Sequence, residues 1–291
     1  MLNLTKQGET FMKFRTLLLA SAAVMVTTSA MAMDITNPFY LPTEGKFLSS
    51  TSLEQNRAKA DNGVVEGVEK AMYAHEELTY GVTNNFAVVA GIGNTFDYGT
   101  DNGSTEKPYN NDHNFDYTLG VKYNYTNGKL LTQAGVAYRT MNPESFVGKA
   151  NYVDSDTNER WYKELAGYVR VGYEMCCITP YTEFTAVGEL DRDNNEQVYS
   201  WKLGAYKKWD KLNLDAGVRY TFDETEDTFE PYGDGKNERF DLELAVKYLV
   251  TDNFSVGAYA SYYLGGDAMD EIDRKDIEYD RTIGLNAKVL F

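Results

Sequence analysis

Few side chains in this sequence of 291 residues offer catalytic chemistry, because it contains only two histidines and two cysteines. His75 stands two residues before Glu77, so both side chains lie on one face of an extended strand. A histidine beside a carboxylate can act as a general base, but covalent hydrolysis also needs a nucleophile within reach of that base. The position two residues after His75 holds Glu77 rather than serine. We therefore interpret His75 as an ordinary polar strand residue.

The two cysteines are adjacent, Cys176 and Cys177, in a short predicted turn over residues 175–178. Neighbouring cysteines can form a disulfide only through a strained ring. No basic side chain adjoins the pair to lower a thiol pKa, so thiolate catalysis is not expected. Three states remain open for the pair: a vicinal disulfide, disulfides to another chain, or two free thiols.

Acidic side chains gather in three segments, residues 191–196, 223–234 and 267–276. Carboxylate oxygens suit Ca²⁺ or Mg²⁺, but these segments lack the glycine of an EF-hand loop. We interpret them as solvated loops and predict no metal site and no cofactor. The formal net charge of the whole chain is −16, which argues against nucleic-acid binding because that function needs basic patches.

The elements that position these residues are β-strands, since apolar and polar residues alternate through most of the chain. Phe240, Leu242 and Leu244 share one face, for example, and Asp241 and Glu243 share the other. We predict twelve strands, with ten or fourteen as alternatives. Their expected spans are 45–54, 67–80, 86–97, 114–125, 130–141, 160–173, 179–190, 197–209, 212–223, 238–249, 254–265 and 277–291.

The connections between these strands alternate between short turns and longer acidic loops. Asn127-Gly128 is a strong hairpin signal, because both residues tolerate positive φ. Most of the strands have at least the ~9–11 residues that a tilted strand needs to cross a membrane. Short turns at one end and long loops at the other are typical of transmembrane β-barrels.

Residues 283–291 alternate without a fault and end on Phe291. A strand of this kind resembles the closing strand of Gram-negative outer-membrane β-barrels, and the resemblance extends over the whole predicted mature chain, residues 33–291. It implies an all-β fold, a single antiparallel up-and-down barrel, in the outer membrane of a Gram-negative bacterium. It also implies that Phe291 is an assembly signal for the barrel-assembly machinery, and that the other partners are outer-membrane lipid and lipopolysaccharide. Divalent cations bridging the acidic loops to lipopolysaccharide phosphate are a further reading of those loops.

Aromatic residues on the predicted outward faces fall into two bands, as expected for rings at the two membrane interfaces. Tyr80, Trp209 and Tyr248 belong to the band near the turns, and Trp201 and Tyr262 to the band near the loops. The alternative is a soluble barrel or sandwich turned inside out, with the apolar faces as its core.

The first residues read as a secretion signal, with Lys13 and Arg15 before an apolar run and Ala30-Met31-Ala32 as the cleavage site. The run is shorter than the ~20 residues of a membrane-spanning helix. We predict residues 1–11 to lie upstream of the true translation start, 12–32 to be the signal peptide, 33–44 to be a periplasmic N-terminal segment and 45–291 to be the barrel.

The inward positions carry charges of both signs together with tyrosines. Those that we predict to line a pore are Glu77, Asp116, Lys122, Arg139, Glu164, Arg170, Tyr181, Glu183, Lys202, Asp215, Arg219, Arg239, Asp241, Glu243, Lys247, Tyr259, Glu278, Asp280 and Lys288. Twelve strands lie between the filled eight-stranded barrels and the open sixteen-stranded ones. We predict a porin-like channel for passive diffusion of small polar solutes or ions, with a modest cation preference. The alternative is a closed structural or surface-interaction barrel, in which the charges form a salt-bridged plug.

A hydrolase is the least favoured class. Outer-membrane phospholipases carry a serine two residues after the histidine, where this chain has Glu77. An omptin-like protease would need an Asp-x-His pair, whereas Asp112 and His113 are adjacent. We predict that the protein is not an enzyme and has no catalytic residues.

Glu76 does not fit the predicted pattern of apolar outward residues. Leu78 and Tyr80 face outward, and their spacing places Glu76 on the same face. A carboxylate facing lipid is costly unless it lies near an interface or a bulge shifts the face.

Overall fold

The computed structural model describes residues 34–61, 66–100, 114–141, 162–190, 197–224, 236–266 and 276–291. The predicted upstream stretch and signal peptide lie outside the described residues, as do most of the three acidic segments. At strand ends beside the gaps, only the backbone is described.

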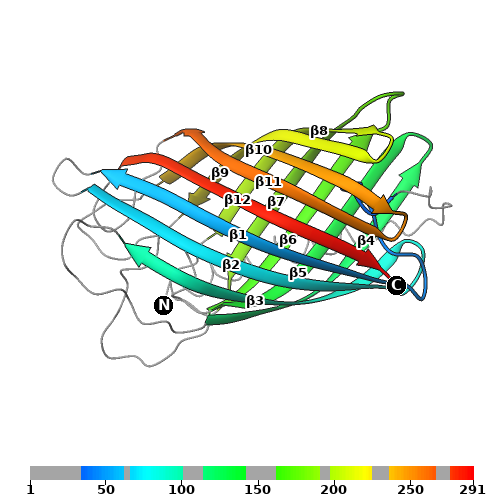
Figure 1. Ribbon diagram of the computed structural model, residues 1–291, viewed down its shortest axis with the longest axis horizontal. Coiled ribbons are helices and arrows are strands. Elements are labelled where there is room, and N and C mark those ends of the chain that lie inside the picture. Colours follow the sequence, from blue (N-terminus) through cyan, green and yellow to red (C-terminus); the bar gives the residue numbers. More distant parts are fainter. Residues whose placement is uncertain are drawn as a thin grey trace, which may run out of the picture.

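The strands form one closed, all-antiparallel barrel in which each strand pairs with its sequence neighbours and the last pairs with the first (Figure 1). They are β1 (Phe47–Asp61), β2 (Glu66–Gly81), β3 (Phe86–Thr100), β4 (Asn114–Asn127), β5 (Leu130–Met141), β6 (Tyr162–Tyr173), β7 (Thr179–Glu189), β8 (Gln197–Trp209), β9 (Leu212–Glu224), β10 (Lys236–Thr251), β11 (Phe254–Gly265) and β12 (Asp276–Leu290). The predicted fold and the count of twelve strands are confirmed. In the described part of the chain, no helix is long and apolar enough to cross a membrane.

The outer surface of the barrel is apolar and the inner surface is polar. Leu119, Leu203 and Leu285 are each more than 60% exposed on the outside. Asp241 and Glu183, by contrast, are buried inside. A soluble barrel turned inside out would show the reverse, so that alternative is wrong. Lipid is the solvent that such an outer surface fits, and a closed barrel leaves no strand edge unpaired in it.

Strand β1 is longer than its sequence pattern predicted, since it continues beyond residue 54 to Asp61. The polar run over residues 55–59 does not alternate, so the sequence signal ends there. Backbone pairing sets the length of β1 instead, because β1 is hydrogen-bonded to β12 on one side and to β2 on the other along nearly its whole length. A register shift at Lys59 absorbs the irregularity.

The short turns and the C-terminus gather at one end of the barrel, called here the turn end (Figure 1). The other end is the loop end. Gly128 has a φ of 59° and Asp210 a φ of 52°, the left-handed conformation that tight hairpin turns require. Aspartate tolerates this conformation better than most residues, and this explains the two-residue turn between β8 and β9.

Candidate functional site in the barrel lumen

The predicted pore-lining residues lie on the inner faces of their strands, as the pairing registers show. The side chain of Glu278 lies outside the described residues. Phe291 faces outward, and its backbone pairs with Phe47 on β1. The structure joins many of the inward side chains into clusters that the sequence did not specify.

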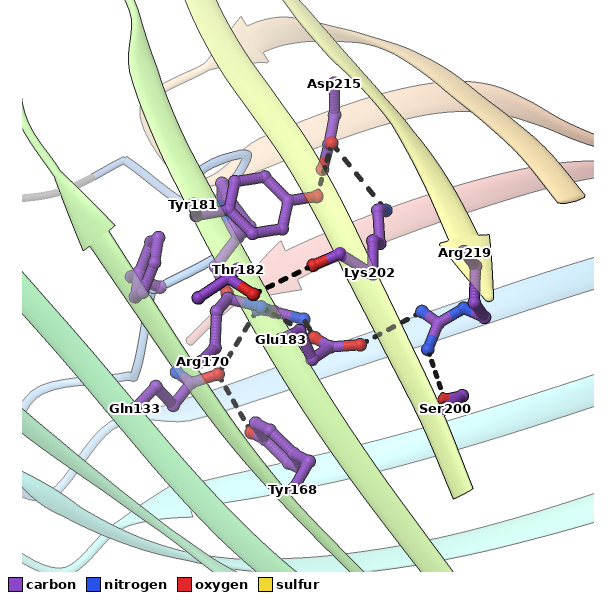
Figure 2. Close-up of polar contacts among 12 residues, drawn as sticks. Gln133, Tyr168, Arg170, Tyr181, Thr182, Glu183, Ser200, Lys202, Asp215 and Arg219 are labelled. Atoms are coloured by element: carbon purple, nitrogen blue, oxygen red, sulfur yellow. Dashed lines mark hydrogen bonds and ion pairs between the residues drawn. The ribbon is translucent and has the colours of Figure 1, made fainter. Parts of the chain in front are cut away.

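The largest cluster is a ladder of ion pairs across β6 to β10, and Figure 2 shows the part of it that lies on β6 to β9. At its centre, the buried Glu183 binds two arginines from opposite sides. Arg170 Nε donates to Glu183 Oε2 over 2.8 Å, and Arg219 Nη2 lies 3.0 Å from Glu183 Oε1. Each charge thus has a partner of opposite sign, which a charge removed from bulk water requires.

The ladder continues from Arg219 toward β10 and back to β8. Arg219 Nε lies 2.6 Å from Glu243 Oε1, and Lys202 Nζ lies 2.8 Å from Glu243 Oε2. Asp215 accepts a hydrogen bond of 2.6 Å from the Tyr181 hydroxyl and lies 3.9 Å from Lys202. The wall formed by β6 to β10, called here the charged wall, is therefore held by an almost continuous polar network.

Smaller clusters occupy the rest of the bore. Arg239 bonds Asp241 and Asp280 at 2.6 and 3.0 Å near the loop end. Nearer the turn end, Lys122 lies 2.7 Å from Glu77.

Lys247 and Lys288 differ from the ion-paired inward bases, which are Lys122, Arg170, Lys202, Lys208, Arg219 and Arg239. In the part of the chain that the structure describes, neither has a carboxylate oxygen within 4.0 Å. Lys247 instead donates to the Thr36 carbonyl oxygen at 3.3 Å. These two ammonium groups are uncompensated by direct ion pairs.

Charge is unevenly distributed along the bore. Among described residues at the three inward positions nearest the turn end of each strand, bases outnumber acids. The bases are Lys122, Arg170, Lys208, Lys247 and Lys288, and the acids are Glu77, Glu183 and Asp215. Further toward the loop end acids outnumber bases. The acids there are Glu54, Asp116, Glu164, Asp241, Glu243 and Asp280, and the bases are Arg139, Lys202, Arg219 and Arg239.

The adjoining wall, formed by β3 to β5, has several glycines among its inward residues and is called here the glycine wall. Its inward positions include Gly91, Gly93, Gly120 and Gly135. Side chains from neighbouring strands lie flat on it. A Cβ atom at Gly135 would lie only 2.4 Å from the Tyr168 ring. The glycines thus hold aromatic rings against the wall instead of letting them project into the bore.

The turn end of the lumen is closed by residues 34–42, called here the N-terminal segment. Ile35 and Phe39 are each 1% exposed. Ile35 packs with Leu48 on β1 and Leu249 on β10. Phe39 packs on the opposite side of the bore, edge-on to Tyr181. The segment therefore spans the lumen from wall to wall.

Side chains rather than backbone pairing attach this segment to the barrel. Its own backbone hydrogen bonds run within the segment, from Asn37 to Asp34 and from Tyr40 to Asn37. Arg170 donates to the Pro38 carbonyl oxygen and Asn124 to that of Phe39. Such an attachment can be released without breaking a strand ladder.

Asp34 forms the outermost attachment through an ion pair with Lys208 on β8. Its carboxyl also accepts a hydrogen bond of 2.9 Å from the Thr36 backbone N–H. Burial raises the pKa of Asp34, but the bonds to Lys208 and Thr36 outweigh burial and hold that pKa below its usual value. The ionised form of Asp34 is thus the one that fits the closed segment.

Sequence reasoning placed residues 33–44 on the periplasmic side but did not foresee that residues 34–42 would enter the lumen. A signal was present: Ile35, Phe39 and Leu41 are apolar, yet they belong to no strand pattern. Apolar side chains outside a strand need another surface to cover them. Gly172 on β6 supplies part of that surface, because a Cβ atom there would lie 2.7 Å from the Phe39 ring.

A cavity of about 280 Å³ lies between the N-terminal segment and the β6–β7 turn. Asp34 and Lys208 line it together with Cys176 and Cys177. Both cysteines are exposed free thiols, with their sulfur atoms 3.1 Å apart. The hydrogen bond between them raises the pKa of the Cys176 thiol, which makes it a poor nucleophile.

His75 lies on the inner face of β2, with its ring stacked on that of Tyr73 at 6.1 Å between centroids. Ser52 on β1 stands directly opposite His75 in the strand register, a pairing that sequence reasoning missed. The ring reaches over Gly91 on the other side, however, and the Ser52 hydroxyl donates to Glu54 over 3.5 Å. The two side chains thus point to different partners.

Comparisons with known proteins agree with the fold. No protein-family model matches the sequence, and no curated protein matches it. Among solved structures, the chain is similar to the COG4313 outer membrane channel from Pseudomonas putida F1. The TM-score is 0.62 at 11% identity, over 91% of this chain and 100% of that one.

Two more distant matches are translocating barrels of autotransporters. The NalP translocator domain from Neisseria meningitidis has a TM-score of 0.46 at 11% identity, over 98% of this chain and 97% of that one. The AIDA-I transport unit from Escherichia coli has a TM-score of 0.46 at 12% identity, over 89% and 93%. At these identities the likeness shows the fold alone, that of an outer-membrane β-barrel. The apolar outer surface is consistent with the predicted location in the outer membrane of a Gram-negative bacterium.

Proposed function

We propose that the protein is an outer-membrane channel for passive diffusion of small polar solutes or ions, closed at its turn end by its own N-terminal segment. The observation that carries this proposal is the way the segment is attached. It fills the lumen, yet only side-chain contacts hold it to the barrel wall. Beyond it, flat rings on the glycine wall border a bore lined by polar groups.

A modest cation preference remains part of the proposal. The acidic excess toward the loop end supports it, because fixed carboxylates concentrate cations at a channel mouth. The bases near the turn end oppose it. Net selectivity is then set by whichever region is narrower once the N-terminal segment has moved.

A closed structural or surface-interaction barrel is the second candidate. The ion-pair ladder favours it, since acids and bases are paired across the charged wall. In both cases we propose outer-membrane lipid, lipopolysaccharide and the barrel-assembly machinery as partners. We also propose that the protein is not an enzyme, because His75 and Ser52 point to different partners.

Planar-bilayer conductance of the mature protein tests the choice between these candidates. Replacing Ile35 and Phe39 together by serine removes the apolar contacts that hold the segment, whereas Val250→Ser alters an exposed residue near the end of β10. We expect rare, small current steps from the wild type and the Val250→Ser control. The double variant should give frequent, larger steps. A double variant that folds but never conducts would favour the closed barrel.

A further inference from the structure

Three consecutive sulfur-bearing residues, Met175, Cys176 and Cys177, lie in the turn between β6 and β7. All three line the cavity of about 280 Å³ that separates this turn from the N-terminal segment. Both cysteines are free and exposed. The proposed channel needs none of these side chains, so passive diffusion does not explain their grouping beside a cavity.

The backbone of this turn is fixed on two sides. The Met175 N–H donates to the Ile178 carbonyl oxygen over 3.0 Å, which closes the turn. The Glu174 N–H donates over 2.8 Å to the carbonyl oxygen of Lys129 in the neighbouring β4–β5 turn. Adjacent side chains of an extended strand point to opposite faces, but in this turn the two cysteine sulfur atoms lie 3.1 Å apart. Groups that are already positioned lose less conformational freedom when they bind a ligand.

The spacing of the two sulfur atoms suits a single metal ion bonded to both. Metal–thiolate bonds are ~2.3 Å long, so one ion with tetrahedral or trigonal bond angles holds two sulfur atoms about 4 Å apart. Cys176 and Cys177 reach that separation when each sulfur atom moves by about 0.5 Å, a change within the reach of side-chain rotation. A disulfide between adjacent cysteines requires a strained ring instead. A shared metal ion avoids that strain.

The donor atoms select a soft metal ion. Thiolate and thioether sulfur favour Cu(I), whereas carboxylates favour hard ions such as Ca²⁺. The Asp34 carboxylate also lines the cavity, but it is already bound to Lys208 and Thr36. Among the described residues, no group of three or more histidine, cysteine, aspartate or glutamate side chains is placed to hold a metal ion. A third ligand beside the two thiolates is therefore best supplied by the Met175 thioether.

Lys208 supplies positive charge beside these sulfur atoms, because it lines the same cavity. Binding of one Cu(I) ion breaks two S–H bonds, forms two metal–sulfur bonds and releases two protons to water. The bound site then carries one negative charge in excess, which the nearby ammonium group stabilises. The hydrogen bond between the thiols raises the pKa of Cys176, so its proton is present before the ion binds. Affinity should therefore increase as the pH rises.

We propose that Met175, Cys176 and Cys177 form a binding site for one soft, thiophilic metal ion, Cu(I) being the ion that fits the three sulfur ligands best. The turn end of such barrels faces the periplasm, and the exposed cysteines give an ion from that side a way in. This differs from the sequence-based prediction of no metal site, which considered carboxylate ligands alone. The site lies outside the bore, so it does not depend on whether the barrel conducts.

The test is competition for Cu(I) between the full mature chain in detergent and the chelator bicinchoninate, under argon. We expect the wild type to bind one Cu(I) ion per chain. Cys176→Ser and Cys177→Ser should each weaken binding by about 100-fold or more, and Met175→Leu by about tenfold. Ile178→Ser alters an exposed side chain of the same turn, keeps all three sulfur atoms and should bind like the wild type. Heat-modifiable migration in gels checks that each variant has folded.

Four results would overturn the proposal. The first is a vicinal disulfide, in place of two free thiols per chain, in protein purified from outer membranes without reductant. The second is one Cu(I) ion shared by two chains. Equal weakening by Ile178→Ser and Cys176→Ser would show that the shape of the turn matters and its sulfur atoms do not. Met175→Leu that binds Cu(I) like the wild type would remove the three-sulfur site.

Discussion

The charged wall and the glycine wall adjoin each other at β5 and β6 and border one bore, but they are stabilised in different ways. On the charged wall, side chains such as Glu183 reach across the strand faces and bind one another. On the glycine wall, the glycines have no side chain, and rings such as Tyr168 lie flat over them. On the charged wall the charges satisfy one another, whereas on the other wall the glycines leave space that rings from neighbouring strands occupy.

For the proposed channel, this contrast predicts where a solute would pass and what would resist it. Breaking an ion pair on the charged wall exposes a bare charge, so that wall should change little during transport. A solute moving beside the glycine wall meets aromatic faces and peptide groups. Altering the charged wall and altering the glycine wall should therefore lower the free energy of unfolding by different amounts and for different reasons.

Glu183→Ala should have the largest effect, because it leaves Arg170 and Arg219 without their shared carboxylate. Removing one partner of a buried pair costs about 3–5 kcal/mol. Urea unfolding in lipid vesicles, followed by tryptophan fluorescence, measures the change in the free energy of unfolding. The exposed Glu44→Ala should stay within about 0.5 kcal/mol of the wild type. A Glu183→Ala barrel as stable as this control would mean that the ladder is incidental.

Gly135→Ala tests the other wall. The added methyl group would lie 2.4 Å from the Tyr168 ring and must push that ring into the bore. Overpacking of this kind costs about 1–3 kcal/mol, and the displaced ring should also reduce conductance. A methyl group at Gly188 would meet no atom within 4 Å, so Gly188→Ala is the matched control. If both alanines behave alike, Tyr168 is not held flat.

Much of the fold could be predicted because lipid imposes a simple rule. Apolar residues must face outward on alternate positions, and the last strand obeys this rule from Ile283 to Phe291. The rule fails where outward residues are polar, as in the second half of β1, where pairing with two neighbours takes over. Strand ends therefore depend on partners that no local pattern contains.

The candidate site was predictable only in part. Alternation identifies Glu183 as an inward residue, but it cannot show that one arginine comes from the adjacent β6 and another from β9, two strands away. Those contacts depend on the curvature of the closed barrel and on side-chain length. The N-terminal segment has no periodicity at all, and the space that receives Phe39 exists only when the barrel has closed.

Lys247 and Lys288 sharpen the comparison, because their ammonium groups take no part in the ion-pair ladder of the charged wall. Replacing both by glutamine removes positive charge near the turn end, so the channel should become more cation-selective. A single charge acts on an ion 4 Å away in water with about 1 kcal/mol, so this effect is smaller than the previous two. Reversal potentials in a KCl gradient, in the Ile35→Ser, Phe39→Ser background, measure it. Lys129→Gln alters an exposed turn and should leave the reversal potential unchanged.

Acidification should release the N-terminal segment from both walls, and this is the smallest expected effect. The pKa of Asp34 is lower in the folded protein than its usual value, so its stabilising contribution is complete above that usual value. The contribution is lost as the pH falls through the folded pKa, when the carboxylate that faces Lys208 becomes neutral. Channel opening should therefore increase only below about pH 4, well under neutral pH.

Asp34→Asn separates this carboxyl from the other acids of the lumen. It should open at neutral pH as often as the wild type does in acid, and its opening should respond less to acidification. Lys208→Met removes the same ion pair from the barrel side and should have the same effect. If Asp34→Asn stays closed at neutral pH and still opens in acid, another carboxyl group governs the response. Glu183 would be the first to examine, because Arg170 contacts both it and the N-terminal segment.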